Sequence, residues 1–385
     1  MTRPRYVACL GNSADAEAFG GTPFHLFEAG QQAGLFTAAL DLRLAPPQLR
    51  GIAKGIRALG RFSRGLGVFG DQYSEDYIDS SWASFPEHDC SILNIFQLYP
   101  ERIIDNVHID KWFYIDQTLR QLFENYPNRR PSRRYLADIV RREQQQYQVA
   151  SGIIATSEWA RRSLVEEYAV NGSKVFVVAR GANVYRAQAS AAVRSTPKQR
   201  DPNAPLVLVF VGKEWKRKGL DRLIDGLLWA RERGANIHLN VIGPRRAEIT
   251  GVRRYVDGIT WHGPINKARE FDRFWGILEG SHVGCLLSSA EAGGISLREF
   301  HLAGLPVIAP AVGGAPEFAI PEACNLVDPS ASPAEIGLLI ERLCRDQQLL
   351  LRQTNCAFQS RSRMTWDYAV REMQAIINGE THKRT

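Results

Sequence analysis

The sequence has no uninterrupted apolar run of the roughly 18 residues that a membrane-spanning helix requires. Residues 1–19 also lack the apolar segment and small-residue cleavage site of a secretory signal peptide, so we expect a cytoplasmic protein. The 6 cysteines are scattered with no C-x-x-C pair, which excludes a disulfide scaffold. No D-x-D motif, internal repeat or low-complexity tract is present.

The composition is that of an ordinary globular protein. Hydrophobic residues make up 44% and charged residues 23%, which excludes intrinsic disorder. With 385 residues, the length predicts two or three domains at about 150 residues each. Lys and Arg number 48 against 41 for Asp and Glu, a net charge of +7. This mild excess fits an anionic substrate, a membrane surface or nucleic acid, and does not choose among them.

Short apolar runs recur along the whole chain, with helical patterns such as Leu220–Arg233 and Ala334–Cys344 between them. The runs are continuous rather than alternating in polarity, which is typical of parallel strands covered on both faces. The predicted strands are Tyr6–Leu10, Leu35–Leu40, Cys90–Phe96, Trp112–Ile115, Gly152–Thr156, Val175–Val178, Leu206–Val211, Ile237–Ile242, Ile259–Trp261, Val283–Leu287, Pro306–Ala309 and Asn325–Val327. The pattern predicts an α/β protein with two Rossmann-like, doubly wound domains facing a central cleft.

A polar segment without periodicity divides the two predicted domains. Residues 186–204 contain Pro and Ser but no apolar pattern, and we interpret them as a linker. Residues 1–185 then form the first domain and residues 205–363 the second. Each side is long enough to bury a core of its own.

Two glutamates eight residues apart flank the predicted start of a helix. Glu291 precedes a helix that begins near Gly294, and Glu299 lies inside it. The free N–H groups and positive dipole end of the helix favour a diphosphate, which Gly293 allows to approach closely. A carboxylate within the helix can accept hydrogen bonds from a ribose diol, and one before it can hold sugar hydroxyls. A surface loop with two solvated glutamates is the alternative.

The loop after the predicted strand Leu206–Val211 carries four cations. They are Lys213, Lys216, Arg217 and Lys218. Ligands of doubly wound sheets bind at the carboxyl ends of strands, where cations can neutralise a diphosphate leaving group without a metal. A solvated basic loop is the alternative, and Arg217 either contributes or faces solvent.

The spacing of Glu291 and Glu299, the A-G-L-P-V-I-A segment and Gly313–Glu317 together resemble the retaining glycosyltransferases of the GT-B fold, glycosyltransferase family 4 or glycosyl transferases group 1. The family often opens its motif with E-P-F-G, where this chain has E-A-G-G. The resemblance implies a hexosyltransferase that uses a UDP- or GDP-linked sugar as donor and a saccharide or lipid-linked acceptor, in polysaccharide or glycoconjugate synthesis. It implies no metal or other cofactor.

The resemblance also implies roles for particular residues. The first domain would hold the acceptor and the second the donor, with residues 364–385 packing back on the first. The implied catalytic residues are Glu291, Lys218 and Asp116. The implied donor-binding residues are Gly21, Lys213, Lys218, Ile265, Gly293, Gly294, Ile295, Ser296 and Glu299. Lys213 stands where the family more often has Arg. Retention would proceed by same-face attack, with the leaving phosphate taking the acceptor's proton.

Three sites outside the glutamate motif have two interpretations each. Gly21, in a G-G loop after the first strand, either lies against the donor phosphates or makes a plain turn. Asp116 either orients an acceptor hydroxyl or caps the helix Leu119–Asn125, and His108 is a further candidate on the acceptor. Ile265 lies in an H-G-P-I turn of the kind that holds the nucleotide base in the family.

A basic tract and two rival functions remain open. Lys54, Arg57, Arg61 and Arg64 share one face of a possible helix, which either docks on anionic lipid at the inner membrane face or is simply solvated. A second basic tract consists of Arg129, Arg130, Arg133, Arg134, Arg141 and Arg142. A nucleic-acid site would need interleaved aromatic residues or a known motif, and this tract has only Tyr135, so we expect no nucleic-acid partner. The rival functions are a nucleotide-sugar 2-epimerase of GT-B architecture and a non-catalytic module that binds a phosphorylated ligand or nucleic acid.

Overall fold

The chain divides into two compact units, each described here by itself. In the computed structural model the described residues are 3–43, 73–85, 88–95, 98–126, 132–185, 196–250 and 257–380. The first unit comprises Met1–Ala179 with Ala369–Thr385, and the second Arg180–Tyr368. Ala182 N–H donates to Met364 O at 2.6 Å, which joins the segment after residue 179 to the second unit. The division therefore falls at 179/180 and 368/369, where the sequence suggested 185/186 and 363/364.

The described strands of the first unit form one parallel sheet of six, in the order β2-β1-β3-β4-β5-β6. They are β1 (Arg5–Cys9), β2 (Ala38–Ala39), β3 (Cys90–Ile95), β4 (Ile109–Ile115), β5 (Gly152–Ala155) and β6 (Val175–Val177). Every residue of β3 and β5 is buried, as expected for parallel strands covered on both faces. The strand order reverses between β1 and β3.

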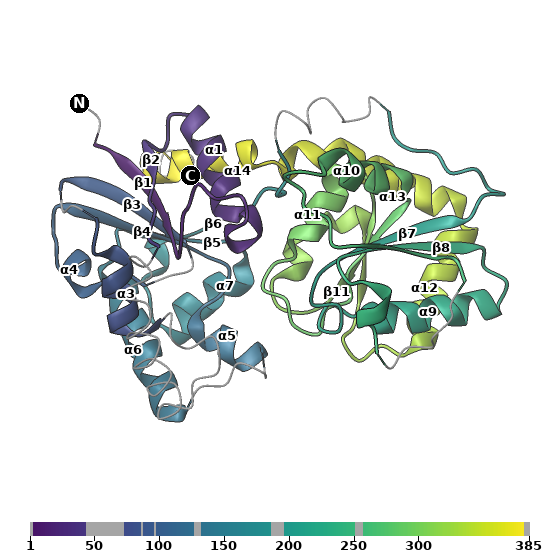
Figure 1. The fold of residues 1–385 in the computed structure, drawn as a ribbon, viewed down its shortest axis with the longest axis horizontal. Coiled ribbons are helices and arrows are strands. Elements are labelled where there is room, and N and C mark those ends of the chain that lie inside the picture. Colours follow the sequence, from purple (N-terminus) through teal and green to yellow (C-terminus); the bar gives the residue numbers. More distant parts are fainter. Residues whose placement is uncertain are drawn as a thin grey trace. The chain divides into compact units, whose positions relative to one another are not determined.

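Helices cover both faces of this sheet (Figure 1). They are α1 (Thr22–Gln32), α3 (Glu75–Trp82), α4 (Glu101–Ile104), α5 (Leu119–Asn125), α6 (Arg133–Val149), α7 (Glu158–Arg162) and α14 (Trp366–Ile377). Side chains of α3 to α7 form one core with β3, β4 and β5. The C-terminal residues pack on the first unit, where Arg5 donates to Asn378 Oδ1 at 2.9 Å and Gln374 to Ala33 O at 3.3 Å.

The second unit contains a parallel sheet of six described strands in the order β12-β11-β10-β7-β8-β9. They are β7 (Leu206–Val211), β8 (Ile237–Ile242), β9 (Ile259–Gly263), β10 (Val283–Cys285), β11 (Val307–Pro310) and β12 (Cys324–Val327). Counted within the unit, this is the order 3-2-1-4-5-6 of Rossmann-type sheets. The strand order reverses between β7 and β10, and ligands of such sheets bind at this switch point, outside the carboxyl ends of the strands.

Two apolar layers sandwich the second sheet (Figure 1). The helices are α9 (Leu220–Glu232), α10 (Phe271–Gly280), α11 (Ile295–Leu302), α12 (Pro333–Arg345) and α13 (Gln347–Ser360). One layer contains side chains of α10, α11 and α13, and the other contains those of α9 and α12 together with Leu350 of α13. The amphipathic helices thus bury their apolar faces against the continuous apolar strands.

Some predicted features lie outside the described residues. These are Lys54, Arg57, Arg61 and Arg64 of the basic tract, and residues 186–195 of the predicted linker. Within the parts of the chain that the structure describes, we find no helix with the length and apolar character needed to cross a bilayer.

Candidate functional site

Two loops of the second unit are joined at the switch point between β7 and β10. Leu287 N–H donates to Lys218 O at 3.1 Å, and Ser289 N–H donates to Arg217 O at 2.9 Å. Gly219 ends the first loop with φ +71°, a conformation that L side chains rarely adopt. A Cβ on Gly219 would lie 2.1 Å from Leu287 O. Only glycine therefore allows the cationic loop to approach the loop that leads to Glu291.

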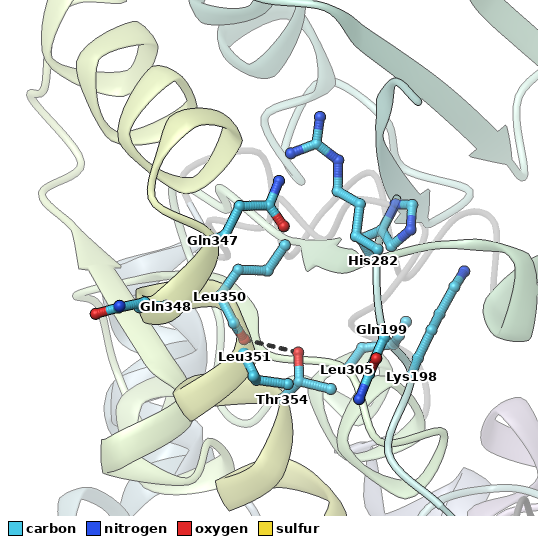
Figure 2. Close-up of a pocket in the computed structure, with 10 residues that line it drawn as sticks. Lys198, Gln199, His282, Leu305, Gln347, Gln348, Leu350, Leu351 and Thr354 are labelled. Atoms are coloured by element: carbon cyan, nitrogen blue, oxygen red, sulfur yellow. Dashed lines mark hydrogen bonds between the residues drawn. The ribbon is translucent and has the colours of Figure 1, made fainter. Parts of the chain in front are cut away.

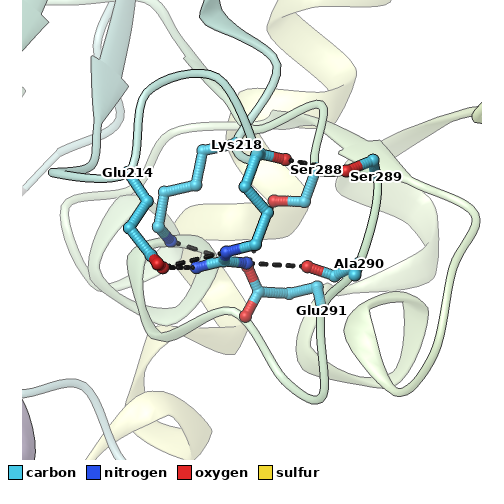
Figure 3. Close-up of polar contacts among 7 residues, drawn as sticks. Glu214, Lys218, Ser288, Ser289, Ala290 and Glu291 are labelled. Carbon is cyan, nitrogen blue, oxygen red and sulfur yellow. Dashed lines mark hydrogen bonds and ion pairs between the residues drawn. The ribbon is translucent and has the colours of Figure 1, made fainter. Parts of the chain in front are cut away.

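Glu291 is surrounded by donors from both loops (Figure 3). Its Oε2 lies 3.5 Å from Lys218 Nζ and 3.3 Å from Arg217 Nη1, and Ser288 Oγ donates to it at 3.1 Å. The side chain is only 12% exposed. Burial raises the pKa of Glu291, but the charges of Lys218 and Arg217 outweigh it and hold the pKa below its usual value. Glu291 is therefore a buried, ionised carboxylate at neutral pH.

Arg217 belongs to the site, which the sequence left open. Its Nη1 donates to Ala290 O at 2.7 Å and its Nε to Glu214 Oε2 at 2.9 Å (Figure 3). The guanidinium thus links the two loops. Lys213 and Lys216 are exposed, and neither forms an ion pair with Glu291 or Glu299 within the described parts of the chain. The loop therefore presents two cations to the carboxylate and two to solvent.

The start of α11 presents unsatisfied polar atoms. Gly294 is the N-cap with φ +114°, and a Cβ on Gly293 would lie 2.6 Å from the ring of Phe318. Ser296 Oγ and Glu299 Oε2 are buried and have no hydrogen-bond partner among the described residues. A buried polar atom without a partner costs about 1–3 kcal/mol, so native proteins rarely leave two close together without a use. The pair marks a place where a polar ligand fits.

Glu299 is fully buried and pairs with Lys267, which the sequence analysis did not single out. Lys267 Nζ contacts Glu299 Oε1, leaving Oε2 as the unpartnered oxygen. Burial raises the pKa of Glu299, while Lys267 and Lys218 oppose the rise without cancelling it. Lys267 follows β9 in the same turn as Ile265, which is half-buried against the core. In the sequence, the one feature that could have indicated Lys267 is its place two residues after Ile265, which had been assigned to the donor site.

In the first unit, Gly21 and Asp116 follow the carboxyl ends of β1 and β4. Gly21 is the N-cap of α1 with φ +90°. Asp116 does not cap α5, so that interpretation was wrong. The cap is Thr118, whose hydroxyl accepts from Gln121 N–H at 3.2 Å. His108 is exposed and precedes β4, at the opposite edge of the sheet from Asp116. The two acceptor candidates therefore cannot serve one site together.

These features define a class of protein. The fold is the GT-B fold of glycosyltransferases, with the charged loops at the switch point of its second unit. Residues 194–360, which contain those loops, match the family model described as Glycosyl transferases group 1. The match supports a group 1 glycosyltransferase, and hence a transferase.

Particular relatives are similar to this chain. The D-inositol 3-phosphate glycosyltransferase of Corynebacterium diphtheriae is 24% identical over 245 residues, which cover 61% of this chain and 57% of that protein. WaaG, a glycosyltransferase involved in lipopolysaccharide biosynthesis, has a TM-score of 0.64 at 14% identity, covering 97% of this chain and 99% of its own. HepE of Anabaena, solved with UDP and glucose, has a TM-score of 0.58 at 13% identity, covering 98% and 100%. None of these supports the epimerase or the binding module.

Proposed function

We propose that this protein is a retaining hexosyltransferase that moves a sugar from a UDP- or GDP-linked donor to a saccharide or lipid-linked acceptor. One observation carries the proposal. Lys218 and Arg217 meet the ionised Glu291 beside a helix start at which Ser296 Oγ and Glu299 Oε2 are buried without partners. Cations, a free helix N-terminus and hydroxyl-binding carboxylates are what a nucleotide sugar needs.

Different residues of the site would bind different parts of the donor. Its diphosphate would lie against Lys218 and the N–H groups of residues 293–296, with Lys213 available from the exposed part of the loop. Glu299 Oε2 would accept from the ribose diol, and Glu291 would hold hydroxyls of the sugar. Ile265 would lie against the base, and Gly21 of the first unit against the phosphates.

Lys218 and Arg217 would drive the reaction electrostatically. As the bond between the sugar's C1 and the diphosphate oxygen breaks, negative charge grows on the diphosphate, and fixed cations stabilise it. The acceptor oxygen bonds to C1 on the same face, and its proton passes to the departing phosphate oxygen. Asp116 would orient the acceptor hydroxyl. Since protein cations neutralise the leaving group, we propose that no metal is required.

The wider setting is part of the same proposal. Relatives that act in lipopolysaccharide biosynthesis support a role in polysaccharide or glycoconjugate synthesis. A lipid-linked acceptor would favour peripheral attachment to anionic lipid at the inner membrane face through Lys54, Arg57, Arg61 and Arg64. The proposed location is otherwise cytoplasmic.

The test is a donor screen by release of free nucleotide, with EDTA present, followed by product analysis. We expect release from one UDP- or GDP-sugar and a product that keeps the donor's anomeric configuration. Glu291→Gln and Lys218→Met should lower kcat by about 100-fold or more. Lys216→Met is the matched control, because Lys216 is exposed in the same loop, and it should keep wild-type turnover. Unchanged rates in both site variants, or an epimerised donor without transfer, would overturn the proposal.

A further inference from the structure

A cavity in the second unit lies at the opposite edge of the sheet from Glu291. His282 directly precedes β10, Leu305 precedes β11, and Arg200 lies upstream of β7, so the cavity faces the amino ends of these strands. The space free of atoms in and in front of the cavity is about 680 Å³, open solvent included. Figure 2 shows the residues that line it. The charged loops described above follow the carboxyl ends of β7 and β10. The cavity is therefore separate from the proposed donor site.

The wall of the cavity is cationic. None of its 10 lining residues is Asp or Glu, while Lys198 and Arg200 are both among them. Arg200 Nη1 donates to Cys344 O at 2.6 Å and its Nη2 to Ala204 O at 2.7 Å. These carbonyls fix the guanidinium in place but carry no net charge. No carboxylate forms an ion pair with Arg200 within the described residues. Lys198 Nζ likewise donates to Glu279 O and Ser281 O, each at 2.9 Å. The positive charge of Arg200 favours a negative charge close to it.

His282 adds an oriented donor to the same wall. Its Nδ1 accepts a hydrogen bond from Val207 N–H at 2.9 Å. Burial, with the neighbouring charges of Lys198 and Arg200, lowers the pKa of His282 to about 3, so the ring is neutral. A neutral imidazole that accepts at Nδ1 carries its hydrogen on Nε2. The ring that lines the cavity therefore offers an N–H donor and no charge that changes near neutral pH.

The other residues that line the cavity have mainly amide or apolar side chains. Gln347 and Gln348 open α13, whose N-cap is Asp346, a carboxylate that accepts from Leu349 N–H at 2.8 Å. Leu305, Leu350 and Leu351 form the apolar part (Figure 2). Leu351 is 40% exposed. The combination matches a molecule with one anionic end and a short apolar body.

We propose that this cavity binds a small organic anion, whose carboxylate or phosphate faces Arg200 and His282 and whose apolar body packs on the leucines. The carboxylate and the phosphate ester share one binding chemistry. Two probes, butanoate and n-butyl phosphate, distinguish binding of a carboxylate from binding of a phosphate ester.

The test is calorimetric titration of the full-length protein with each probe. Gln348→Glu adds a negative charge to the cavity wall at the first turn of α13, where acids favour the helix, so the fold is retained. Gln359→Glu makes the same charge change at an exposed position of the same helix outside the cavity. We expect binding of at least one probe, weakened roughly fivefold or more by Gln348→Glu and unchanged by Gln359→Glu. Arg200→Gln should weaken it as well.

The outcomes decide the proposal either way. Saturable heat from butanoate alone, from n-butyl phosphate alone or from both supports the site and identifies its head group. No heat from either probe overturns it. Equal binding by wild type and Gln348→Glu also overturns it, and so does displacement of the probe by UDP or GDP, which would place the anion at the donor site.

Discussion

At the scale of single residues, the site contains a buried carboxylate, Glu299, whose nearest cation is Lys267. Glu299 is fully buried, and burial raises its pKa while Lys267 opposes the rise. In Lys267→Met, that opposition is lost and the pKa of Glu299 rises further. The ionised form, which we propose accepts from the ribose, then appears only at higher pH. We expect the acid limb of the donor KM to move to higher pH, with KM about tenfold higher at pH 6.

The measurement is the pH profile of donor KM and kcat for wild type, Lys267→Met and Lys267→Arg. Arginine keeps the charge and should restore most of the wild-type profile. Arg269→Gln is the control, because Arg269 is exposed in the same turn. A lower KM in Lys267→Met, with an unshifted profile, would mean that Lys267 blocks the ribose position instead of balancing Glu299.

Local sequence predicted the two glutamates and the cationic loop but not all of their partners. Glu291 and Lys218 stand in motifs whose spacing carries chemistry, so they could be chosen in advance. Lys267 follows β9 and meets Glu299 of α11 although β7 and β8 separate β9 from β10 in the sheet, and no motif records that contact. Lys213 stands at a motif position, yet its side chain is exposed. Side-chain direction within a loop depends on tertiary contacts that spacing alone does not encode.

At the scale of elements, the two glycines at the ends of α9 allow the cost of a strained backbone to be measured apart from the cost of a steric clash. Gly219 has φ +71° and Gly234 has φ +85°, so alanine is strained at both. A Cβ on Gly219 meets Leu287 O at 2.1 Å, whereas a Cβ on Gly234 meets nothing within 4 Å. Gly234→Ala should therefore cost about 1–2 kcal/mol of unfolding free energy with normal kcat. Gly219→Ala should cost more and lower kcat, because it separates the loops that hold Lys218 and Glu291.

Denaturant unfolding and kcat, measured on both variants, check this expectation. Equal stability and equal turnover in the two alanine variants would show that the approach of the loops does not depend on Gly219. A stability loss confined to Gly219→Ala, with unchanged kcat, would show that the approach supports the fold but not catalysis.

Elements were easier to predict than their ends. Leu206–Val211 and Ile237–Ile242 have the predicted bounds, because an apolar run in a buried parallel strand ends where polar residues begin. The predicted strand Leu35–Leu40 shrinks to Ala38–Ala39, at the edge of its sheet. An edge strand pairs on one side only, so its apolar residues can be buried by loop packing without ladder hydrogen bonds. Apolar periodicity therefore locates a strand better than it measures its length.

At the scale of the whole molecule, the chain passes between its two units at 179/180 and again at 368/369. From the sequence we expected these passages at 185/186 and 363/364, which differs from these bounds. Gly181 shows why, since a Cβ there would lie 2.2 Å from Trp366 N. The segment after β6 and the segment before α14 are packed together in the second unit. Contacts between segments so far apart in sequence leave no local pattern.

This arrangement makes α14, from Ala369 onward, a part of the first unit that the far end of the chain supplies. Val370 and Met373 are fully buried in it, whereas Glu372 is exposed on the same helix. Met373→Ala should cost about 2–5 kcal/mol of unfolding free energy, and that loss should fall on the first unit. Hydrogen exchange should become faster in β1 and β3 while β7 and β8 keep their protection, because the second unit has its own cores. Glu372→Ala should leave both units unchanged. Equal loss of protection in the two sheets would mean that the units unfold as one cooperative body.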